Sequence, residues 1–75
     1  MDKLPRKSEP KLDNCVRELR TQLKLTQQSL ADKVGVTRQT IVAMESSSYV
    51  PSLPLAIRLS RVVDRAVEEV FTLEE

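Results

Sequence analysis

A short run of side chains between residues 37 and 43 has the chemistry needed to recognise the edges of nucleic-acid bases. It comprises a guanidinium, a carboxamide, two methyl-bearing hydroxyls and a small apolar group: Arg38, Gln39, Thr37, Thr40 and Ala43. Arginine can donate to both acceptors of guanine, glutamine can pair with adenine, and the methyls of threonine and alanine suit the thymine methyl. No acidic residue, which would repel phosphate, occurs between Thr37 and Met44. The run therefore predicts a surface that contacts bases in double-stranded DNA.

These side chains lie in the second of two amphipathic helical patterns that span residues 26–45 and are broken at Gly35. Gly35 is the only glycine of the chain, and we expect it just beyond the first helix, in the left-handed conformation that glycine adopts at little cost. Thr26 and Thr37 are the expected N-caps. Two short helices joined this tightly are typical of a helix-turn-helix, whose second helix enters the major groove. The alternative is ordinary packing of two helices, which predicts no pattern on the outward face.

Apolar spacing elsewhere predicts three further helices. Asp13 is the expected N-cap of the first, Ser52 caps the fourth, and residues 66–71 form a short fifth helix. Short connections between short helices indicate an all-α fold, a compact five-helix bundle over residues 13–75. Residues 1–12 contain two prolines and mixed charge without apolar periodicity, so we expect a flexible basic arm there.

The composition argues against catalysis and metal binding. The 75 residues include no histidine and a single cysteine, so two-histidine metal sites and an internal disulfide are excluded. The sequence has no nucleophile beside a base and no glycine-rich phosphate loop. We therefore expect no enzymatic activity, no cofactor, no metal and no small-molecule ligand. No apolar run reaches the length of a membrane span, and we expect a cytoplasmic protein without membrane contact.

Charge supports nucleic-acid binding only weakly, because the formal net charge is +1 and strongly basic domains are the more usual DNA binders. The distribution is more informative, since basic side chains gather toward the N-terminus and acidic ones toward the C-terminus. One end could thus face phosphate and the other a partner subunit. Residues 67–73 carry Val70, Phe71 and Leu73 with little core left to cover them all, which predicts a homodimer contact.

Several sequence blocks, in register over about residues 14 to 73, resemble the lambda repressor and Cro-like helix-turn-helix family, also called the xenobiotic-response-element family. The blocks are Arg17-Glu-Leu-Arg, Leu25-Thr-Gln, Leu30-Ala-Asp-Lys-Val-Gly-Val-Thr-Arg-Gln-Thr-Ile, Met44-Glu, Tyr49-Val-Pro-Ser-Leu and Val67-Glu-Glu-Val-Phe. The nearest resemblance is to the short, single-domain regulators of this family. It implies a sequence-specific DNA-binding transcriptional regulator, most simply a repressor, that reads the major groove with the helix of residues 37–45.

The resemblance also implies roles for individual residues. Arg38, Gln39 and Ala43 match base-facing positions, with Thr37 and Thr40 beside them. Gln27 and Ser46 match positions that contact phosphate before and beyond the base-reading helix. Arg20 and Glu45 match a partly buried ion pair that fastens the first helix to the third.

The chain departs from the family where glycine commonly ends a helix, because Lys24, Ser47 and Asp64 stand at those positions. A left-handed conformation there would cost each on the order of 1 kcal/mol, and Asp less. The usual Asn-Gly-Lys loop reads Ser46-Ser47-Ser48, which loses a charge near phosphate. Backbone and side-chain groups of this serine loop remain expected phosphate contacts, and Lys24 could partly replace the missing charge.

A function of a different class stays open. The chain could be an antitoxin or an adaptor module whose main role is to bind another protein. An antitoxin normally carries an extra segment that wraps its toxin, and only residues 1–12 are available for that purpose. Replacing Arg38 and Gln39 separates the classes, because an adaptor would keep its partner.

Overall fold

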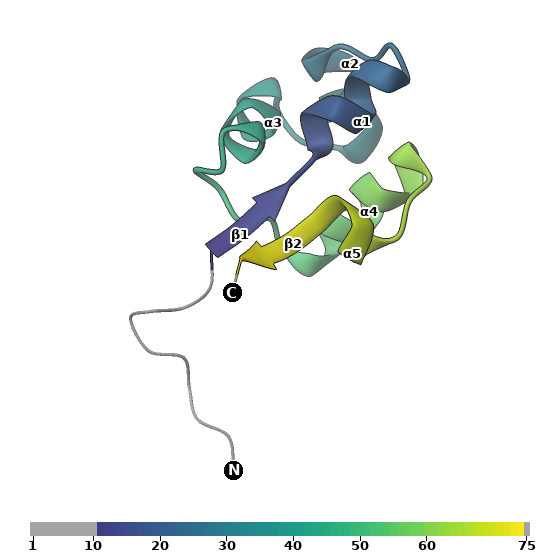
Figure 1. Cartoon of the computed structure of the whole chain (residues 1–75). Helices are drawn as coiled ribbons and strands as arrows, with labels where there is room; N and C mark the ends of the chain where they lie inside the picture. The colour runs from purple at the N-terminus through teal and green to yellow at the C-terminus, as the bar shows by residue number, and fades with distance from the viewer. Residues whose placement is uncertain (1–10, 75) are drawn as a thin grey trace.

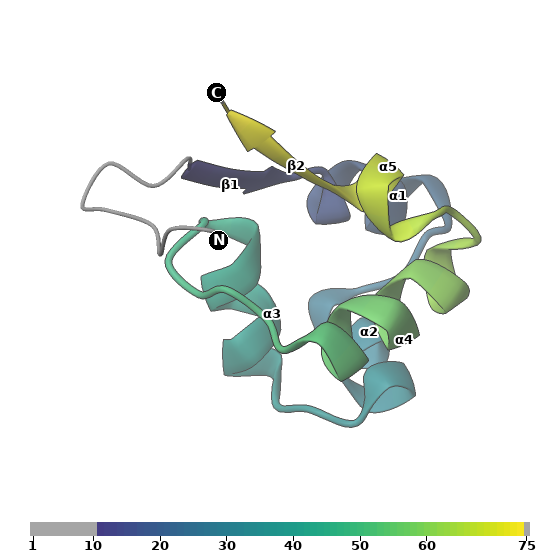
Figure 2. The ribbon, with the colours of Figure 1, turned by 90° about the horizontal axis from the view of Figure 1, so that it is seen from below.

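The computed structural model describes residues 11–74, which form five helices and two short strands (Figure 1). In chain order the elements are β1 (Lys11–Asn14), α1 (Val16–Gln22), α2 (Gln27–Val34), α3 (Arg38–Glu45), α4 (Leu53–Val63), α5 (Val67–Val70) and β2 (Phe71–Glu74). The predicted helix-turn-helix corresponds to α2 and α3. In the views of Figures 1 and 2, α3 lies at one side of the molecule and α5 at the other.

Side-chain caps begin three of the helices at the predicted residues. The hydroxyl of Thr26 accepts a hydrogen bond from the N–H of Ser29 at 2.9 Å, and Thr37 and Ser52 cap α3 and α4 in the same way. Each such bond satisfies one of the backbone donors that a helix N-terminus leaves free. Gly35 ends α2 with φ +78°, as expected, so the chain can turn sharply between the two helices.

The expectation of an all-α fold is wrong in one respect, because the two ends of the described chain pair as an antiparallel two-stranded sheet. Lys11 lies opposite Glu74, Leu12 opposite Leu73, Asp13 opposite Thr72 and Asn14 opposite Phe71. Side chains alternate between the two faces of a strand. One face of the sheet therefore carries the two leucines with Asn14 and Phe71, and the other carries polar side chains.

Because of the sheet, two helices begin or end at other residues than predicted. Asp13 lies in β1 and does not cap α1; the side-chain oxygen of Asn14 instead accepts a hydrogen bond from the N–H of Val16 at 3.0 Å. Lys11 and Leu12, assigned to the arm, belong to the same strand. Phe71 opens β2, so the fifth helix ends at Val70. The rest of the predicted arm, residues 1–10, lies outside the described residues.

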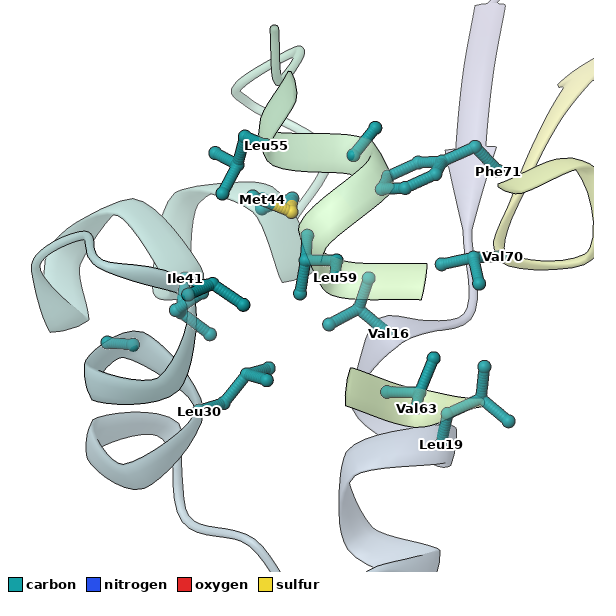
Figure 3. Packing of buried hydrophobic residues seen from close by; sticks show 13 residues of the cluster. Val16, Leu19, Leu30, Ile41, Met44, Leu55, Leu59, Val63, Val70 and Phe71 are labelled. Atoms are coloured by element: carbon teal, nitrogen blue, oxygen red, sulfur yellow. The ribbon is translucent and has the colours of Figure 1, made fainter. Parts of the chain in front are cut away.

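The hydrophobic core lies between the helices and the start of β2 (Figure 3). Its largest fully buried side chains are Leu30, Ile41, Met44, Leu59, Val16, Val34 and Val70. Burying an aliphatic side chain of this size stabilises the fold by roughly 1.5–3 kcal/mol. Because α2 and α3 each bury residues in this cluster, the core fixes the position and orientation of α3.

The C-terminal segment is more buried than its sequence predicts. Val70 is buried and Phe71 is only 8% exposed, both within this chain. Neither side chain is therefore free for the predicted homodimer contact, whereas Leu73 stays 57% exposed. None of the helices formed by residues 11–74 has the length and apolar character needed to cross a membrane.

Candidate nucleic-acid interface

The two faces of α3 differ sharply in what they present. Ile41 and Met44 are fully buried, and residues roughly half a helical turn away point to solvent because each residue advances by 100°. We call the opposite side the outward face; it comprises Arg38, Gln39, Val42, Ala43 and Ser46. Four of these residues are exposed and Ala43 is half-buried. Thus the structure places three predicted base-facing residues together on one accessible surface.

The two predicted threonines lie at the N-terminal edge of this face and are partly occupied by structure. Thr37 accepts a hydrogen bond from the N–H of Thr40 at 3.3 Å, and the two hydroxyl oxygens lie 3.2 Å apart. Thr40 is half-buried, whereas Thr37 is exposed. Thr37 is therefore first of all the cap of α3, and its methyl group remains available to a ligand.

Val42 is a member of the outward face that the sequence reasoning missed. It is 40% exposed and lies one helical turn beyond Arg38, next to Gln39 in the i, i+3 sense. The sequence reasoning placed Val42 neither in the core nor among the base-facing residues. The signal that could have found it is the helical phase, because Val42 directly follows the buried Ile41 and cannot point the same way.

The expected contact between Arg20 and Glu45 is present and binds α1 to the C-terminal end of α3. Arg20 Nε donates to Glu45 Oε2 at 2.7 Å and Arg20 Nη2 donates to Oε1 at 3.3 Å. The side chains are 12% and 1% exposed. The exposed Arg17 adds a third nitrogen, 3.6 Å from Glu45 Oε1. Breaking such a buried pair would leave an uncompensated charge.

Glu45 is ionised in this setting. Burial by itself would raise the pKa of the Glu45 carboxyl, but hydrogen bonds from Arg20 and Gln27, together with the charge of Arg20, outweigh burial and lower the pKa. A carboxylate that accepts several hydrogen bonds is stabilised in its charged form. The cluster of Arg17, Arg20, Gln27 and Glu45 is therefore a charged link among the first three helices, which we call the Glu45 cluster.

Gln27, the predicted phosphate contact at the start of α2, is a member of this cluster. Its amide nitrogen donates to Glu45 Oε1 at 3.1 Å. An amide NH₂ group has two hydrogens, so one can hold Gln27 on Glu45 while the other remains free to donate outward. The first turns of both α2 and α3 also lack acidic residues, which leaves the partial positive charge of these helix N-termini available to an anion.

Asn14 is a second structural residue that the sequence reasoning missed. Its side-chain oxygen accepts from the N–H of Val16, the first residue of α1, and its side-chain nitrogen donates to the backbone carbonyl of Met44 at 2.9 Å. Carbonyls in the last turn of a helix lack intrahelical partners. The Met44 carbonyl accepts the N–H of Ser47 at 3.0 Å as well, so Asn14 adds a second bond to it and ties the terminal sheet to the C-terminal end of α3.

The remaining predicted phosphate contacts lie in two turns with left-handed backbone. Lys24 has φ +59° and Ser47 has φ +64°, and Asp64, at the end of α4, has φ +58°. The three residues that replace the glycines usual in the family therefore adopt the left-handed conformation, which the sequence left open. Ser46 and Ser48 point their hydroxyls inward, since both donate to the carbonyl of Ala43, at 3.0 and 3.1 Å. The serine loop is thus folded against the end of α3.

Comparison with known proteins agrees with this architecture. Residues 16–70 match the family model described as Helix-turn-helix. The chain is 52% identical over 61 residues to an HTH-type transcriptional regulator of Methanothermobacter thermautotrophicus, covering 80% of this chain and 88% of the relative. It is 45% identical over 64 residues to the HTH-type transcriptional regulator YgzD of Bacillus subtilis, covering 85% of this chain and 97% of the relative.

Two solved structures have folds similar to most of this chain. The restriction-modification controller protein C.AhdI from Aeromonas hydrophila has a TM-score of 0.67 and 31% identity, over 72% of this chain and 78% of that protein. A putative DNA-binding protein from Bacteroides fragilis has a TM-score of 0.74 over 81% of this chain and 98% of its own, but with 18% identity it supports the fold alone. On the family match and the curated relatives together, the chain belongs to the Cro-like helix-turn-helix family of DNA-binding transcriptional regulators.

Proposed function

We propose that the chain represses transcription by binding a specific duplex with α3 in the major groove. Arg38 and Gln39 would face base edges through hydrogen bonds, and Ala43 would contact a thymine methyl. The observation that carries the proposal is the outward face of α3, where these groups are gathered without a carboxylate and fixed by a buried core on the opposite side. The similarity to transcriptional regulators supports the same reading.

Phosphate contacts on either side of the groove would set the register. Gln27 uses one of its two amide hydrogens on Glu45 at the start of α2, so the second would donate to phosphate. The serine loop of Ser46, Ser47 and Ser48 follows the end of α3, and its Ser46 and Ser48 hydroxyls would turn from the carbonyl of Ala43 to phosphate on binding. Lys24 would add a charge at the turn before α2. Such contacts position a protein on DNA and carry little sequence information themselves. Because few of them are charged, we expect a shallow dependence of affinity on salt concentration.

A homodimer would supply the affinity that one module of this size lacks. Dimers of helix-turn-helix proteins bind half-sites about one helical turn, or roughly 34 Å, apart. Of the apolar residues predicted for a dimer contact, Leu73 remains exposed. Sedimentation at micromolar concentration should show a dimer that Leu73→Glu weakens. A chain that stays monomeric with and without DNA would remove this part of the proposal.

Selection of bound duplexes from a random DNA pool tests the function directly. We expect a consensus with two inverted half-sites. Arg38→Ala and Gln39→Ala should each relax the preference at a different base pair, by roughly 10- to 100-fold for a lost bidentate contact. Arg61→Ala is the matched control, because Arg61 is an exposed arginine on α4. Failure to enrich any duplex at low ionic strength would overturn the proposal and favour a protein-binding adaptor or antitoxin.

Repression itself needs a separate measurement. A reporter gene whose promoter contains the selected site should lose expression when the chain is supplied, and the Arg38→Ala, Gln39→Ala double variant should restore it. An increase in expression on binding would instead identify an activator. Neither outcome changes the assignment of the outward face of α3 to DNA contact.

A further inference from the structure

We propose that Val42 is a specificity-determining residue that recognises the methyl group of a thymine in the bound duplex. The inference rests on the proposed function, since it assigns a further residue to the same DNA-reading face. It concerns a side chain to which neither the sequence pattern nor the family resemblance gave a role.

The position of Val42 on α3 is the first argument. Side chains four residues apart lie on the same side of a helix, one turn apart. Val42 therefore follows Arg38 along the outward face, with Gln39 three residues before it. On the other side of the helix, Ile41 and Met44 are fully buried. Whatever binds to Arg38 and Gln39 must also approach Val42.

The chemistry of the side chain is the second argument. Isolated exposed apolar residues are common on protein surfaces, so exposure alone does not imply a role. Val42, however, stands within a cluster of hydrogen-bonding groups, and its β-branched side chain is not favoured by helix propensity at a solvent-exposed position. The C5 methyl of thymine is the apolar feature of the major groove. Val42 offers two methyl groups to match it.

Comparison with Ala43 sharpens the assignment. Ala43 is half-buried, whereas Val42 is 40% exposed. The γ-methyl groups of valine also extend farther from the helix axis than the single β-carbon of alanine. When α3 approaches the groove, Val42 presents the larger accessible apolar surface. The principal methyl contact therefore belongs to Val42, and Ala43 lies closer to the body of the protein.

Replacing thymine by uracil removes only the C5 methyl and leaves base pairing unchanged. Each thymine of the selected duplex is replaced in turn, and dissociation constants are measured for the wild type, Val42→Ala and Val42→Thr. At one thymine per half-site, the wild type should bind the uracil duplex about fourfold more weakly, the effect of one buried methyl-sized group. Val42→Ala should reduce that ratio to about one, and Val42→Thr, which keeps one γ-methyl group, should give a ratio between those of the wild type and Val42→Ala. Thermal unfolding verifies that each variant is folded.

Val50→Thr is the matched control, because it makes the same chemical change at a valine 69% exposed in the connection between α3 and α4. If Val50→Thr weakened a dimer, the affinities for the thymine and uracil duplexes would fall equally. The ratio of the two dissociation constants would then stay at about fourfold. A ratio that Val42 substitutions leave unchanged at every thymine would overturn the inference while the proposed function stands. Failure to select any duplex would remove both.

Discussion

The helix-turn-helix of residues 26–45 and the terminal sheet of β1 and β2 position α3 by different means. In the helix-turn-helix, each boundary is set by a nearby residue: Thr26 and Thr37 begin the helices, and Gly35 ends the first. The sheet instead joins opposite ends of the described chain, and its register depends on tertiary packing. Local signals thus shape α3, while distant contacts hold it in place.

Both regions meet at the C-terminal end of α3. Glu45 connects this end to α1 and α2 through side chains, and Asn14 connects the neighbouring Met44 carbonyl to β1. The C-terminal end of α3 is therefore attached to the rest of the fold by a charged contact through Glu45 and by a neutral contact from Asn14. This arrangement suggests that damage to either region should disturb DNA binding through α3, although only the first region contains predicted base contacts.

The largest expected effect comes from removing the buried side chain with which β2 joins the core. Phe71→Ala should destabilise the fold by about 4 kcal/mol, since it removes an aromatic ring from the core and leaves a cavity. For a domain of this size, that approaches the whole free energy of unfolding. Urea denaturation followed by circular dichroism measures the change. Thr72→Ala, on the exposed face of the same strand, is the control; a small effect of Phe71→Ala would show that the ring adds little to the core.

Breaking the Glu45 cluster should have the next largest effect. Glu45→Gln keeps the side-chain shape but leaves Arg20 without its carboxylate, and we expect a loss of about 3 kcal/mol in the free energy of unfolding. Glu18→Gln is the control, because it neutralises an exposed glutamate on α1. Equal stability of the two variants would show that the buried pair contributes no more than a surface charge.

The same cluster predicts a pH dependence with a defined sign. The pKa of Glu45 is lowered in the folded chain from its ordinary value of 4.5. Its contribution to stability is therefore complete above about pH 4.5 and is lost as the pH falls through the lowered folded value. Unfolding curves measured between pH 7 and pH 3 should show this loss in the wild type. Its persistence in Glu45→Gln would assign the loss to other carboxylates.

The sequence predicts the parts of the fold that local signals shape, and it does not predict the parts that depend on distant contacts. Periodicity and caps located α2, α3 and α4, and family resemblance located the Arg20–Glu45 pair. Asp13 was misread because an acidic residue before an apolar helix is typical of an N-cap, whereas here it lies in a strand. The residues next to Phe71 in the sequence do not show whether it ends a helix or begins a strand. Its state depends on pairing with Asn14, across the whole described chain.

The candidate site divides in a similar way. Residue type predicted Arg38 and Gln39 on the outward face, because their chemistry has little use in a core. Val42 received no role from its residue type, and the helical phase set by Ile41 and Met44 places it on the outward face. Asn14 was missed because its partner is a backbone carbonyl, which leaves no trace in side-chain chemistry.

Asn14 allows the connection between the two regions to be tested. Asn14→Ala removes its bonds to Val16 and Met44 and should cost about 2 kcal/mol. Asn14→Asp can still accept from the Val16 N–H but cannot donate to the Met44 carbonyl. If attachment of α3 matters, the aspartate variant should weaken binding of the selected duplex beyond its loss of stability. Full binding by the aspartate variant, measured well below its melting temperature, would limit the role of Asn14 to its contact with the Val16 N–H.

The smallest expected effects lie in the left-handed turns that flank α2, and they separate backbone geometry from contact. Gly35→Ala should destabilise by about 1 kcal/mol, because φ +78° disfavours a side chain while no atom lies within 4 Å of the added carbon. Lys24→Gly should do the reverse and stabilise by a similar amount, since Lys24 holds φ +59°. Lys24→Asn should fall between lysine and glycine, because asparagine tolerates this conformation better than lysine. Chemical denaturation of the three variants gives the order, and stabilisation by Lys24→Gly shows that the local geometry of this turn is set by the fold against the preference of its own residue.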